Sequence, residues 1–358
     1  MTEVRINLYS DTQTKPTPEM RAAMAAAEVG DEQRGEDPSV NRLTAMTAEL
    51  LGKEAAVFLP SGTMCNQIAV LLHCRPGDEI LTDRTSHIVN AEAGGAAALA
   101  GAMVRTLDGV HGVFSAEQLE EGVRAKSRHA PRSRLVAVEQ TSNQGGGTVW
   151  PLATLGEVAA VARRHGLALH MDGARLLNAT VASGVTAAEF AQPFDTVWVD
   201  LSKGLGCPVG AVLAGSSEAI GEAWQWKQRL GGAMRQAGVI AAAGIYALEH
   251  HVERLAEDHA NARHFAERIA TIPGVAVDPE RVETDIVFFD VAATGLTAAE
   301  LSERLAGLGI RIGASSRTLL RAVTHLDVTR AGVEEAAEAV RAVIGEAAAR
   351  PKIAGTGT

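Results

Sequence analysis

The sequence has few aromatic residues and no excess of basic charge. Only 4% of its 358 residues are Phe, Trp or Tyr, so the stacking platforms that bind single-stranded nucleic acid are not expected. Lysine and arginine number 33 against 43 aspartates and glutamates, a formal net charge of −10. This balance excludes a chain-wide basic field for nucleic acid or an anionic membrane, although a local basic pocket for a small anion stays open. We expect a small-molecule partner.

Cysteines and long apolar runs are also scarce. The three cysteines, Cys65, Cys74 and Cys207, lack metal-ligand spacing, which predicts free, mostly buried thiols in a reducing compartment and no metal site. The longest apolar run, 93–104, is shorter than the ~20 residues that a membrane span needs. The first ten residues lack the apolar core of a signal peptide. The sequence therefore predicts a cytoplasmic protein.

Apolar runs alternate with helical segments over the first two-thirds of the chain. Strands are expected to end at or to cover Leu59, 80–82, 103–106, 135–139, 167–171 and 196–200. Helices are expected at 63–72, 115–124, 155–165 and 218–228. Strands that alternate with helices at this spacing indicate βαβ units and a largely parallel sheet in an α/β fold.

The pattern changes from about residue 247. It predicts a long charged helix at 247–269, short strands near 275, 286–290, 310 and 319–323, and helices at 298–307 and 330–349. We expect a large domain over 1–246, a small α+β domain over 247–350, and a disordered Gly/Thr-rich tail over 351–358. At about 150 residues per domain, the length agrees with two domains.

Two polar residues follow predicted strands directly. Lys203 comes after the strand that ends at Asp200, and Asp172 comes directly after the strand at 167–171. Ligands of α/β folds bind at the carboxyl ends of strands. Alone, the lysine would be read as a surface side chain and the aspartate as a cap of the next helix. Together they match the pair that pyridoxal phosphate requires, an amine for a Schiff base and a carboxylate that keeps the pyridine nitrogen protonated.

A third motif is Pro60-Ser-Gly-Thr-Met64, a turn of small residues between a predicted strand and a predicted helix. Backbone amides at a helix start, with the hydroxyls of Ser61 and Thr63, make a cradle for phosphate. Such turns are common and mostly structural. The ordered combination of this turn, Asp172 and Lys203, each after a strand, favours a cofactor site.

Together these motifs resemble the low-specificity L-threonine aldolases, pyridoxal-phosphate enzymes of fold type I in the aromatic β-eliminating lyase group. The resemblance covers nearly the whole chain. It rests on Ser10-Asp-Thr-Gln-Thr-Lys-Pro-Thr17, Gly35-Glu-Asp-Pro38, Lys53-Glu-Ala-Ala56, Pro60-Ser-Gly-Thr-Met64, Asp172-Gly-Ala-Arg175, Leu201-Ser-Lys-Gly204, Met234-Arg-Gln-Ala-Gly238 and Arg321-Ala-Val-Thr-His325. It implies a large domain with a mostly parallel seven-stranded sheet, a small α+β domain, and a homotetramer with shared active sites.

The resemblance also assigns roles. It implies that Lys203, His87 and Asp172 are catalytic, with Lys203 as the Schiff-base lysine and His87 stacked on the cofactor ring. The implied cofactor-binding residues are Ser61, Gly62, Thr63, His87, Asp172, Arg175, Lys203 and Arg235. Arg235 would reach the phosphate from a neighbouring subunit. The residues implied to hold the substrate carboxylate are Ser10, Arg175 and Arg321, in agreement with the planar fork of a guanidinium group.

Several positions depart from the family pattern. They are Ser142, where a histidine is usual, Gln33-Arg34 in place of Val-Tyr, Asn90 in a stretch that is usually aromatic, Gln13 in place of an apolar residue, and Gln228 in place of a lysine. Lys227 or Arg229 is a candidate to compensate for Gln228. These departures put the substrate and the general base in question. The base is either His87, whose ordinary pKa near ~6.5 suits the task, or a bound water.

The implied activity is retro-aldol cleavage of L-threonine, L-allo-threonine or a related L-β-hydroxy-α-amino acid to glycine and an aldehyde. The alternative is a lyase of the same fold acting on another 3-hydroxy-amino acid, as a phenylserine-type aldolase or by β-elimination. Products separate the two reaction types: glycine with an aldehyde, or a 2-oxo acid with ammonia. A scaffold protein without activity is disfavoured because scaffolding requires neither Lys203 nor Asp172.

Overall fold

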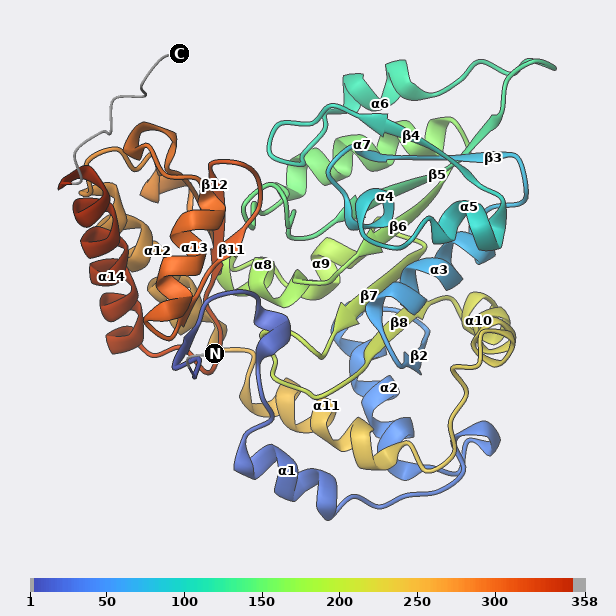
Figure 1. The fold of residues 1–358 in the computed structure, drawn as a ribbon. Coiled ribbons are helices and arrows are strands. Elements are labelled where there is room, and N and C mark those ends of the chain that lie inside the picture. Colours follow the sequence, from blue (N-terminus) through green and yellow to red (C-terminus); the bar gives the residue numbers. More distant parts are fainter. Residues whose placement is uncertain (1–2, 350–358) are drawn as a thin grey trace. The chain divides into compact units, whose positions relative to one another are not determined.

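The computed structural model describes residues 3–349; the tail predicted over 351–358 lies outside the described residues. The chain folds into two compact units (Figure 1). Among the described residues, the large unit holds 14–256, and the small unit holds 3–13 and 257–349. The sequence pattern instead places the first 13 residues with the large domain and the boundary at 247. The N-terminal segment belongs with the C-terminal one because β1 (Ile6–Asn7) pairs with β10 (Ile310–Arg311).

A seven-stranded sheet forms the centre of the large unit, in the order β2-β8-β7-β6-β5-β3-β4. The strands are β2 (Ala55–Leu59), β3 (Asp78–Asp83), β4 (Met103–Leu107), β5 (Arg132–Glu139), β6 (Ala168–Asp172), β7 (Thr196–Asp200) and β8 (Ala211–Gly215). β8 runs antiparallel to β2 and β7, and the other pairs are parallel. The mostly parallel seven-stranded sheet is thus confirmed, with β8 as the strand that the sequence pattern did not predict.

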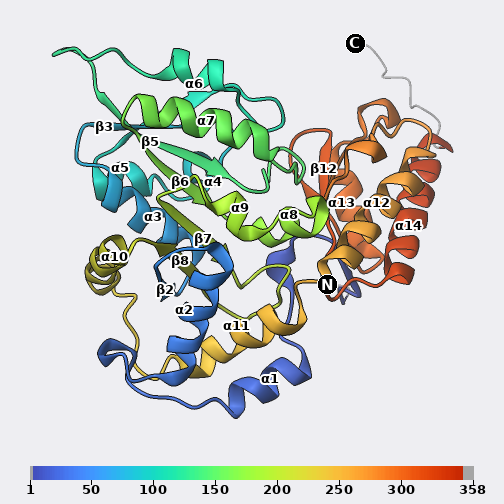
Figure 2. The same cartoon turned by 180° about the vertical axis from the view of Figure 1, so that it is seen from behind.

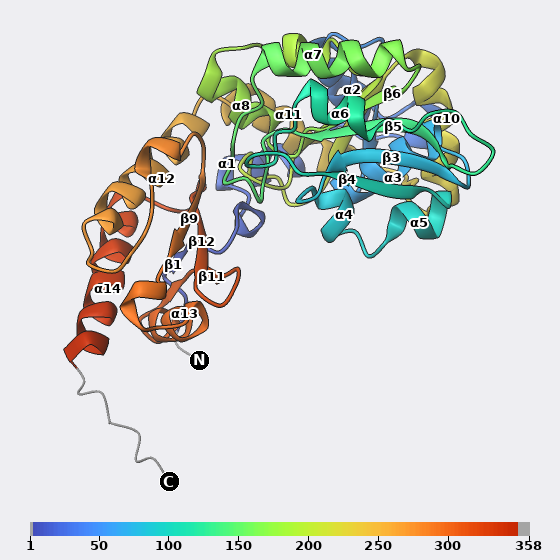
Figure 3. The ribbon, with the colours of Figure 1, turned by 90° about the horizontal axis from the view of Figure 1, so that it is seen from above.

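Both faces of this sheet are apolar, as expected for strands that are covered by helices on both sides. On β5, Val136 and Val138 belong to one core cluster, whereas Leu135 and Ala137 belong to another. Because successive side chains of a strand point to opposite faces, the two clusters lie on opposite sides of the sheet. Figures 2 and 3 show α7 (Leu152–Arg164) on one side and α3 (Gly62–His73) on the other.

Side-chain caps explain where several helices of the large unit begin. Thr17, Asp37 and Ser216 each accept a hydrogen bond from a backbone amide in the following turn, which satisfies a donor that has no partner within the helix. Besides α3 and α7, the helices of the large unit are α1 (Pro18–Ala25), α2 (Pro38–Leu51), α4 (His87–Asn90), α5 (Gly95–Ala100), α6 (Ala116–Gly122), α8 (Leu176–Ser183), α9 (Ala187–Ala191), α10 (Ser217–Arg229) and α11 (Gly238–His250), with the 3-10 turn η2 (Glu32–Arg34). The 3-10 turn η1 (Asp11–Gln13) belongs to the small unit.

One predicted helix is wrong. The segment 247–269 is divided between α11, which ends at His250, and α12 (Leu255–Ala270). At the break, the buried His251 directs its ring Nδ1 to the backbone oxygen of Leu205 at 2.7 Å. The continuous helical pattern of the sequence does not reveal this tertiary contact.

The small unit is an α+β structure. The antiparallel strands β11 (Gly313–Ala314), β12 (Leu319–Val323) and β9 (Ile286–Asp290) form a sheet in that order. The helices are α12, α13 (Ala298–Gly307) and α14 (Arg330–Ala349), with 3-10 turns η3 (Pro279–Arg281) and η4 (Ala292–Thr294). The strand predicted near 275 is reduced to an isolated bridge between Ala276 and Asp290. Among residues 3–349, no helix has the length and apolar character that a membrane crossing requires.

Candidate active site

Three predicted motifs meet at one edge of the sheet. In the register of β5 and β6, Glu139 is paired with Asp172, the last residue of its strand. Leu59 at the end of β2 and Asp200 at the end of β7 are both paired with Ala211 of β8. The turn after β2, Asp172 and the turn that carries Lys203 therefore lie along the same edge of the large unit, where ligands of parallel sheets bind.

Lys203 is held close to the end of β7. Its Nζ lies 2.7 Å from Asp200 Oδ2, and its side chain is 18% exposed. Asp200 is itself fixed, because its Oδ1 accepts hydrogen bonds from the backbone and hydroxyl of Ser202. The Lys203 amine also lies 5.6 Å from the centroid of the Trp198 ring. A primary amine is thus presented, partly accessible, at the strand edge.

Asp172 is a buried carboxylate with two hydrogen-bond donors. Oδ1 accepts from the backbone N–H of Ala174 at 3.0 Å, and Oδ2 accepts from Asn66 Nδ2 at 2.7 Å. Burial, reinforced by the nearby charge of Glu139, raises the pKa of Asp172 to about 7, although Lys203 and Asn66 oppose the shift. A protonated ring nitrogen placed beside this carboxylate would favour its charged form.

Ser61, Gly62 and Thr63 form the start of α3. The Ser61 hydroxyl accepts from the backbone N–H of Met64 at 3.2 Å and so caps the helix. A Cβ atom on Gly62 would lie 2.2 Å from the Trp198 ring, so the helix start can approach the sheet this closely only without a side chain there. The amides of the first turn of a helix, with its dipole, favour an anion such as phosphate.

His87 begins α4 and is tied to two carboxylates that the sequence pattern did not reveal. Its backbone N–H donates to Glu139 Oε2 at 2.6 Å, and its ring Nδ1 lies 2.9 Å from Glu92 Oε1. The hydrogen bond with Glu92 raises the pKa of His87 above its ordinary value, against the opposing effect of burial. Glu92 follows His87 by five residues, a spacing that carries no recognisable signal, and only the fold reveals the pair.

The residues expected to hold a substrate carboxylate are divided between the two units. Arg175 is buried in the large unit, just before α8, and its backbone N–H donates to Gln140 O at 3.0 Å. In the small unit, Arg321 Nη2 lies 3.5 Å from Tyr9 O, next to Ser10. The small unit therefore brings Ser10 and Arg321 together.

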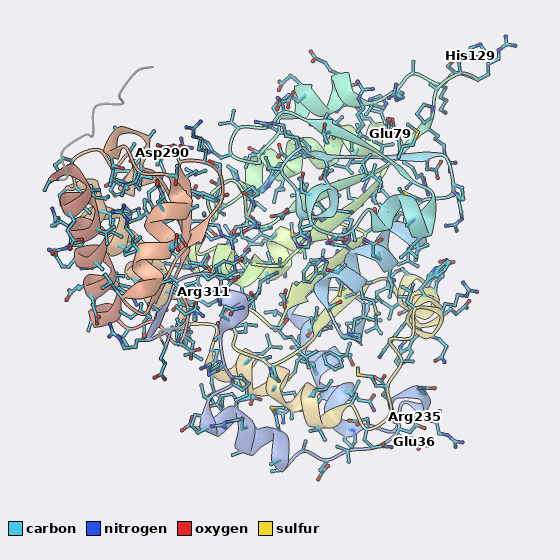
Figure 4. The ribbon with its side chains drawn as sticks, in the orientation of Figure 1. Glu36, Glu79, His129, Arg235, Asp290 and Arg311 are labelled. Atoms are coloured by element: carbon cyan, nitrogen blue, oxygen red, sulfur yellow. The ribbon has the colours of Figure 1, made fainter. Side chains whose placement is uncertain are left out.

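Arg235 is paired with an aspartate of the large unit. Its side chain is 63% exposed and pairs with Asp31, with Nη1 2.9 Å from Oδ2, and Figure 4 shows it near Glu36. The suggested compensation for Gln228 by Lys227 is wrong, because the Lys227 side chain is fully buried and its Nζ is paired with Glu32. The other candidate, Arg229, lies over the Trp226 ring at 4.5 Å from its centroid.

Two of the atypical positions are engaged by local backbone groups. The buried Ser142 accepts a hydrogen bond on Oγ from Gly145 N at 3.2 Å, and a Cβ atom on Gly112 would lie 1.9 Å from that oxygen. Asn90 Nδ2 donates to the backbone oxygens of Arg84 and Ser86 at 2.8 and 3.0 Å. Ser142 is therefore enclosed by its own turn and by the neighbouring one.

One group of side chains offers possible metal ligands. Ligand atoms of His87, Glu92 and Asp172 all lie within 4.8 Å of one another. Both carboxylates, however, accept hydrogen bonds from the same amide nitrogen, Asn66 Nδ2. A cation would have to compete with that donor, so we assign no metal to this group.

The chain resembles known proteins over most of its length. Residues 7–294 match the family model for the beta-eliminating lyases. The low specificity L-threonine aldolase of Escherichia coli K12 is 42% identical over 340 residues, which cover 95% of this chain and 99% of that protein. A probable low-specificity L-threonine aldolase of Arabidopsis thaliana is 40% identical over 334 residues, covering 92% of this chain and 94% of the relative.

A solved structure gives the same result at the level of the fold. The threonine aldolase of Leishmania major superposes with a TM-score of 0.81 at 20% identity, covering 95% of this chain and 99% of the other. The α/β architecture expected from the sequence, fold type I, is thereby confirmed. Because the family model and the closely matching relatives span most of its length, the chain belongs to the beta-eliminating lyase family.

Proposed function

We propose that the chain is a pyridoxal 5'-phosphate-dependent aldolase. It cleaves L-threonine, L-allo-threonine or a related L-β-hydroxy-α-amino acid to glycine and an aldehyde. The observation that carries the proposal is the meeting of Lys203 and Asp172 at one sheet edge, beside the start of α3. The 42% identity with a low specificity L-threonine aldolase supports this choice of reaction.

The residues at this edge fit the cofactor. Asp172 is a buried carboxylate whose raised pKa of about 7 marks it as lacking a cationic neighbour strong enough to hold its charge, and a pyridine nitrogen would supply that cation. Lys203 would carry the cofactor, and the first turn of α3 would hold its phosphate. When bound, the cofactor supplies an electron sink for the carbanion left when Cα–Cβ breaks.

The chain's own groups bind and orient the amino acid. The guanidinium groups of Arg175 and Arg321, with Ser10, would grip the substrate carboxylate, since a planar fork matches a carboxylate geometrically. Fixing the carboxylate sets the direction of the Cα–Cβ bond, which is a positioning contribution to catalysis. Glu92 holds the proton of His87 on Nδ1, so Nε2 is left as an acceptor for the β-hydroxyl proton.

We also propose a homotetramer in which Arg235 acts on the phosphate of a neighbouring subunit. Its exposed side chain supports that role. Light scattering of the purified protein tests the assembly, and a monomer would contradict it. A cytoplasmic location is proposed from the three free, buried thiols, and it is tested by fractionation of cells that express the protein.

The purified protein tests the function in two steps. With bound cofactor it should absorb near ~420 nm and lose that band in Lys203→Ala. It should then release glycine from threonine, allo-threonine or phenylserine. Release of a 2-oxo acid and ammonia instead of glycine would contradict the aldolase reaction, and a colourless wild-type protein that does not respond to pyridoxal phosphate would contradict the cofactor.

A further inference from the structure

Asn66, in the second turn of α3, lies at the centre of a buried polar network. The residue is 1% exposed. Nδ2 lies 2.7 Å from Asp172 Oδ2 and 2.7 Å from Glu92 Oε1. On the other side, Oδ1 lies 2.7 Å from Trp198 Nε1 and 2.9 Å from His170 Nε2. Asn66 is not among the site residues that the sequence analysis predicts.

The orientation of the Asn66 amide follows from its partners. An indole nitrogen donates a hydrogen bond and cannot accept one, so the atom that faces Trp198 must be the amide oxygen. The amide nitrogen then faces the two carboxylates, which in their charged form can only accept hydrogen bonds. Both amide hydrogens of Asn66 are therefore directed at Asp172 and Glu92.

The same reasoning fixes the proton positions further from the site. Since Asn66 Oδ1 only accepts, His170 Nε2 carries a hydrogen. Burial lowers the pKa of His170 to about 3, so its ring is neutral, and Nδ1 accepts from the hydroxyl of Thr196 at 2.8 Å. Thr196 has one hydroxyl hydrogen, so it accepts in turn from His73 Nε2 at 3.0 Å. The hydrogen bonds therefore run in one direction, from His73 through Thr196, His170 and Asn66 to Asp172.

We propose that Asn66 is a positioning residue that holds Asp172 charged and aimed at the ring nitrogen of the cofactor, with its amide locked by Trp198 and His170. The proposal depends on the cofactor assigned above, but not on the identity of the substrate. Donors to a carboxylate favour its charged form. Asp172 needs this help because it is buried, and because Glu139 and Glu92 bring negative charge while Lys203 is the cation that opposes them.

A purely structural role for Asn66 makes a different prediction. If the amide served only to fill the core, its loss would weaken the binding of any ring-shaped ligand to the same extent. If it acts through Asp172, its loss should weaken only the contribution of the ring nitrogen. The quantity to measure is therefore the ratio of two affinities, not one affinity.

The test uses the cofactor-free protein and no amino acid substrate. Dissociation constants are measured for pyridoxal 5'-phosphate and for the analogue in which CH replaces the ring nitrogen. For a charged hydrogen bond we expect the wild-type protein to prefer pyridoxal phosphate by about tenfold or more. In Asn66→Leu and Asn66→Ala this preference should nearly disappear. Gln67→Leu is the matched control, because Gln67 Nε2 donates to Glu92 but not to Asp172, and it should keep the wild-type ratio.

Two different Asn66 variants are used so that the test does not depend on the folding of one of them. Asn66→Ala removes the same donors with a smaller side chain and adds no charge, so it decides the outcome where Asn66→Leu does not fold. A wild-type ratio in the Asn66 variants that fold would overturn the proposal and leave the proposed function standing. A wild-type protein that binds neither ring would overturn both, whereas failure to release glycine would affect only the proposed function.

Discussion

Lys227 Nζ lies 2.8 Å from Glu32 Oε2, and both side chains are completely buried. The pair joins two segments of the large unit that are far apart in sequence. The backbone N–H of Glu32 donates to Arg235 O at 3.0 Å, and its second carboxylate oxygen accepts from Met234 N. Glu32 thus fixes both η2 and the loop that presents Arg235, and Lys227 supplies the charge that permits Glu32 to be buried.

The first prediction concerns this ion pair. Lys227→Met should lower the free energy of unfolding by about 3–5 kcal/mol, because it leaves the charge of Glu32 buried without a partner. The double variant with Glu32→Gln should recover part of the loss, since the amide oxygen still accepts from Met234. Urea unfolding measures both. The control is Lys126→Met at an exposed loop position, where we expect a change within about 0.5 kcal/mol. Equal effects of the two lysine variants would contradict a stabilising role for the pair.

The second prediction concerns the start of α3. Gly62→Ala places a Cβ atom 2.2 Å from the Trp198 ring, so the helix or the indole must move, at a cost of about 1–3 kcal/mol. The affinity for pyridoxal phosphate should fall with it. Gly221→Ala in the middle of α10 meets nothing within 4 Å and should be neutral or stabilising by about 0.5–1 kcal/mol. Thermal unfolding and cofactor titration of the two variants test the contrast, which a neutral Gly62→Ala would refute.

The third prediction concerns the stability of the cofactor-free protein as a function of pH. The pKa of Asp172 is raised from 3.8 to about 7 in the folded chain, so the folded state binds this proton more tightly than the unfolded state does. The stabilisation of the folded state that comes from this tighter proton binding is fully present below pH 3.8. It is lost as the pH rises to about 7.

Asp172→Asn removes this titration while the other groups still titrate in both proteins. The stability of the variant relative to the wild type should therefore increase between about pH 4 and pH 7, by a few kcal/mol at most, and then level off. Urea unfolding at a series of pH values measures the difference. Pyridoxal phosphate should reduce the slope by providing a cation for Asp172. A difference that does not change with pH would show that Asp172 is already charged in the cofactor-free protein.

The local pattern of the sequence predicts the frame of the site well. Apolar strands followed by Asp172 or Lys203 are visible in the sequence, and α14 has the bounds that its periodicity predicts. The strand β8 (Ala211–Gly215) is as long as β6 and β7, but one glycine precedes it and another ends it, and it is defined by pairing with β2 and β7. Its existence depends on neighbours that are distant in the chain.

The polar groups that surround the predicted residues were not predictable in this way. Asn66 is one polar position in a helix, and Glu92 is an acidic residue beside a glycine-rich stretch. Neither pattern says that the two side chains meet at Asp172 and His87. Periodicity identifies the face of an element that is buried, but a hydrogen-bond partner on another element is determined only when the chain has folded.

The last prediction concerns the pair His87 and Glu92. Because the hydrogen bond with Glu92 is the main cause of the raised pKa of His87, Glu92→Gln should lower that pKa. A general base acts in its neutral form, so the acidic limb of the rate profile should move to lower pH by the same amount. The maximal rate should also fall, since a weaker base takes the β-hydroxyl proton less readily. The pH dependence of kcat/KM for glycine release from threonine measures both effects.

The control is His87→Asn, in which the acidic limb due to His87 should be absent. The pH profile of the double variant His87→Asn with Glu92→Gln should then be the same as that of His87→Asn alone. An acidic limb that stays at the wild-type pH in Glu92→Gln would mean that another group, such as a bound water, takes the proton.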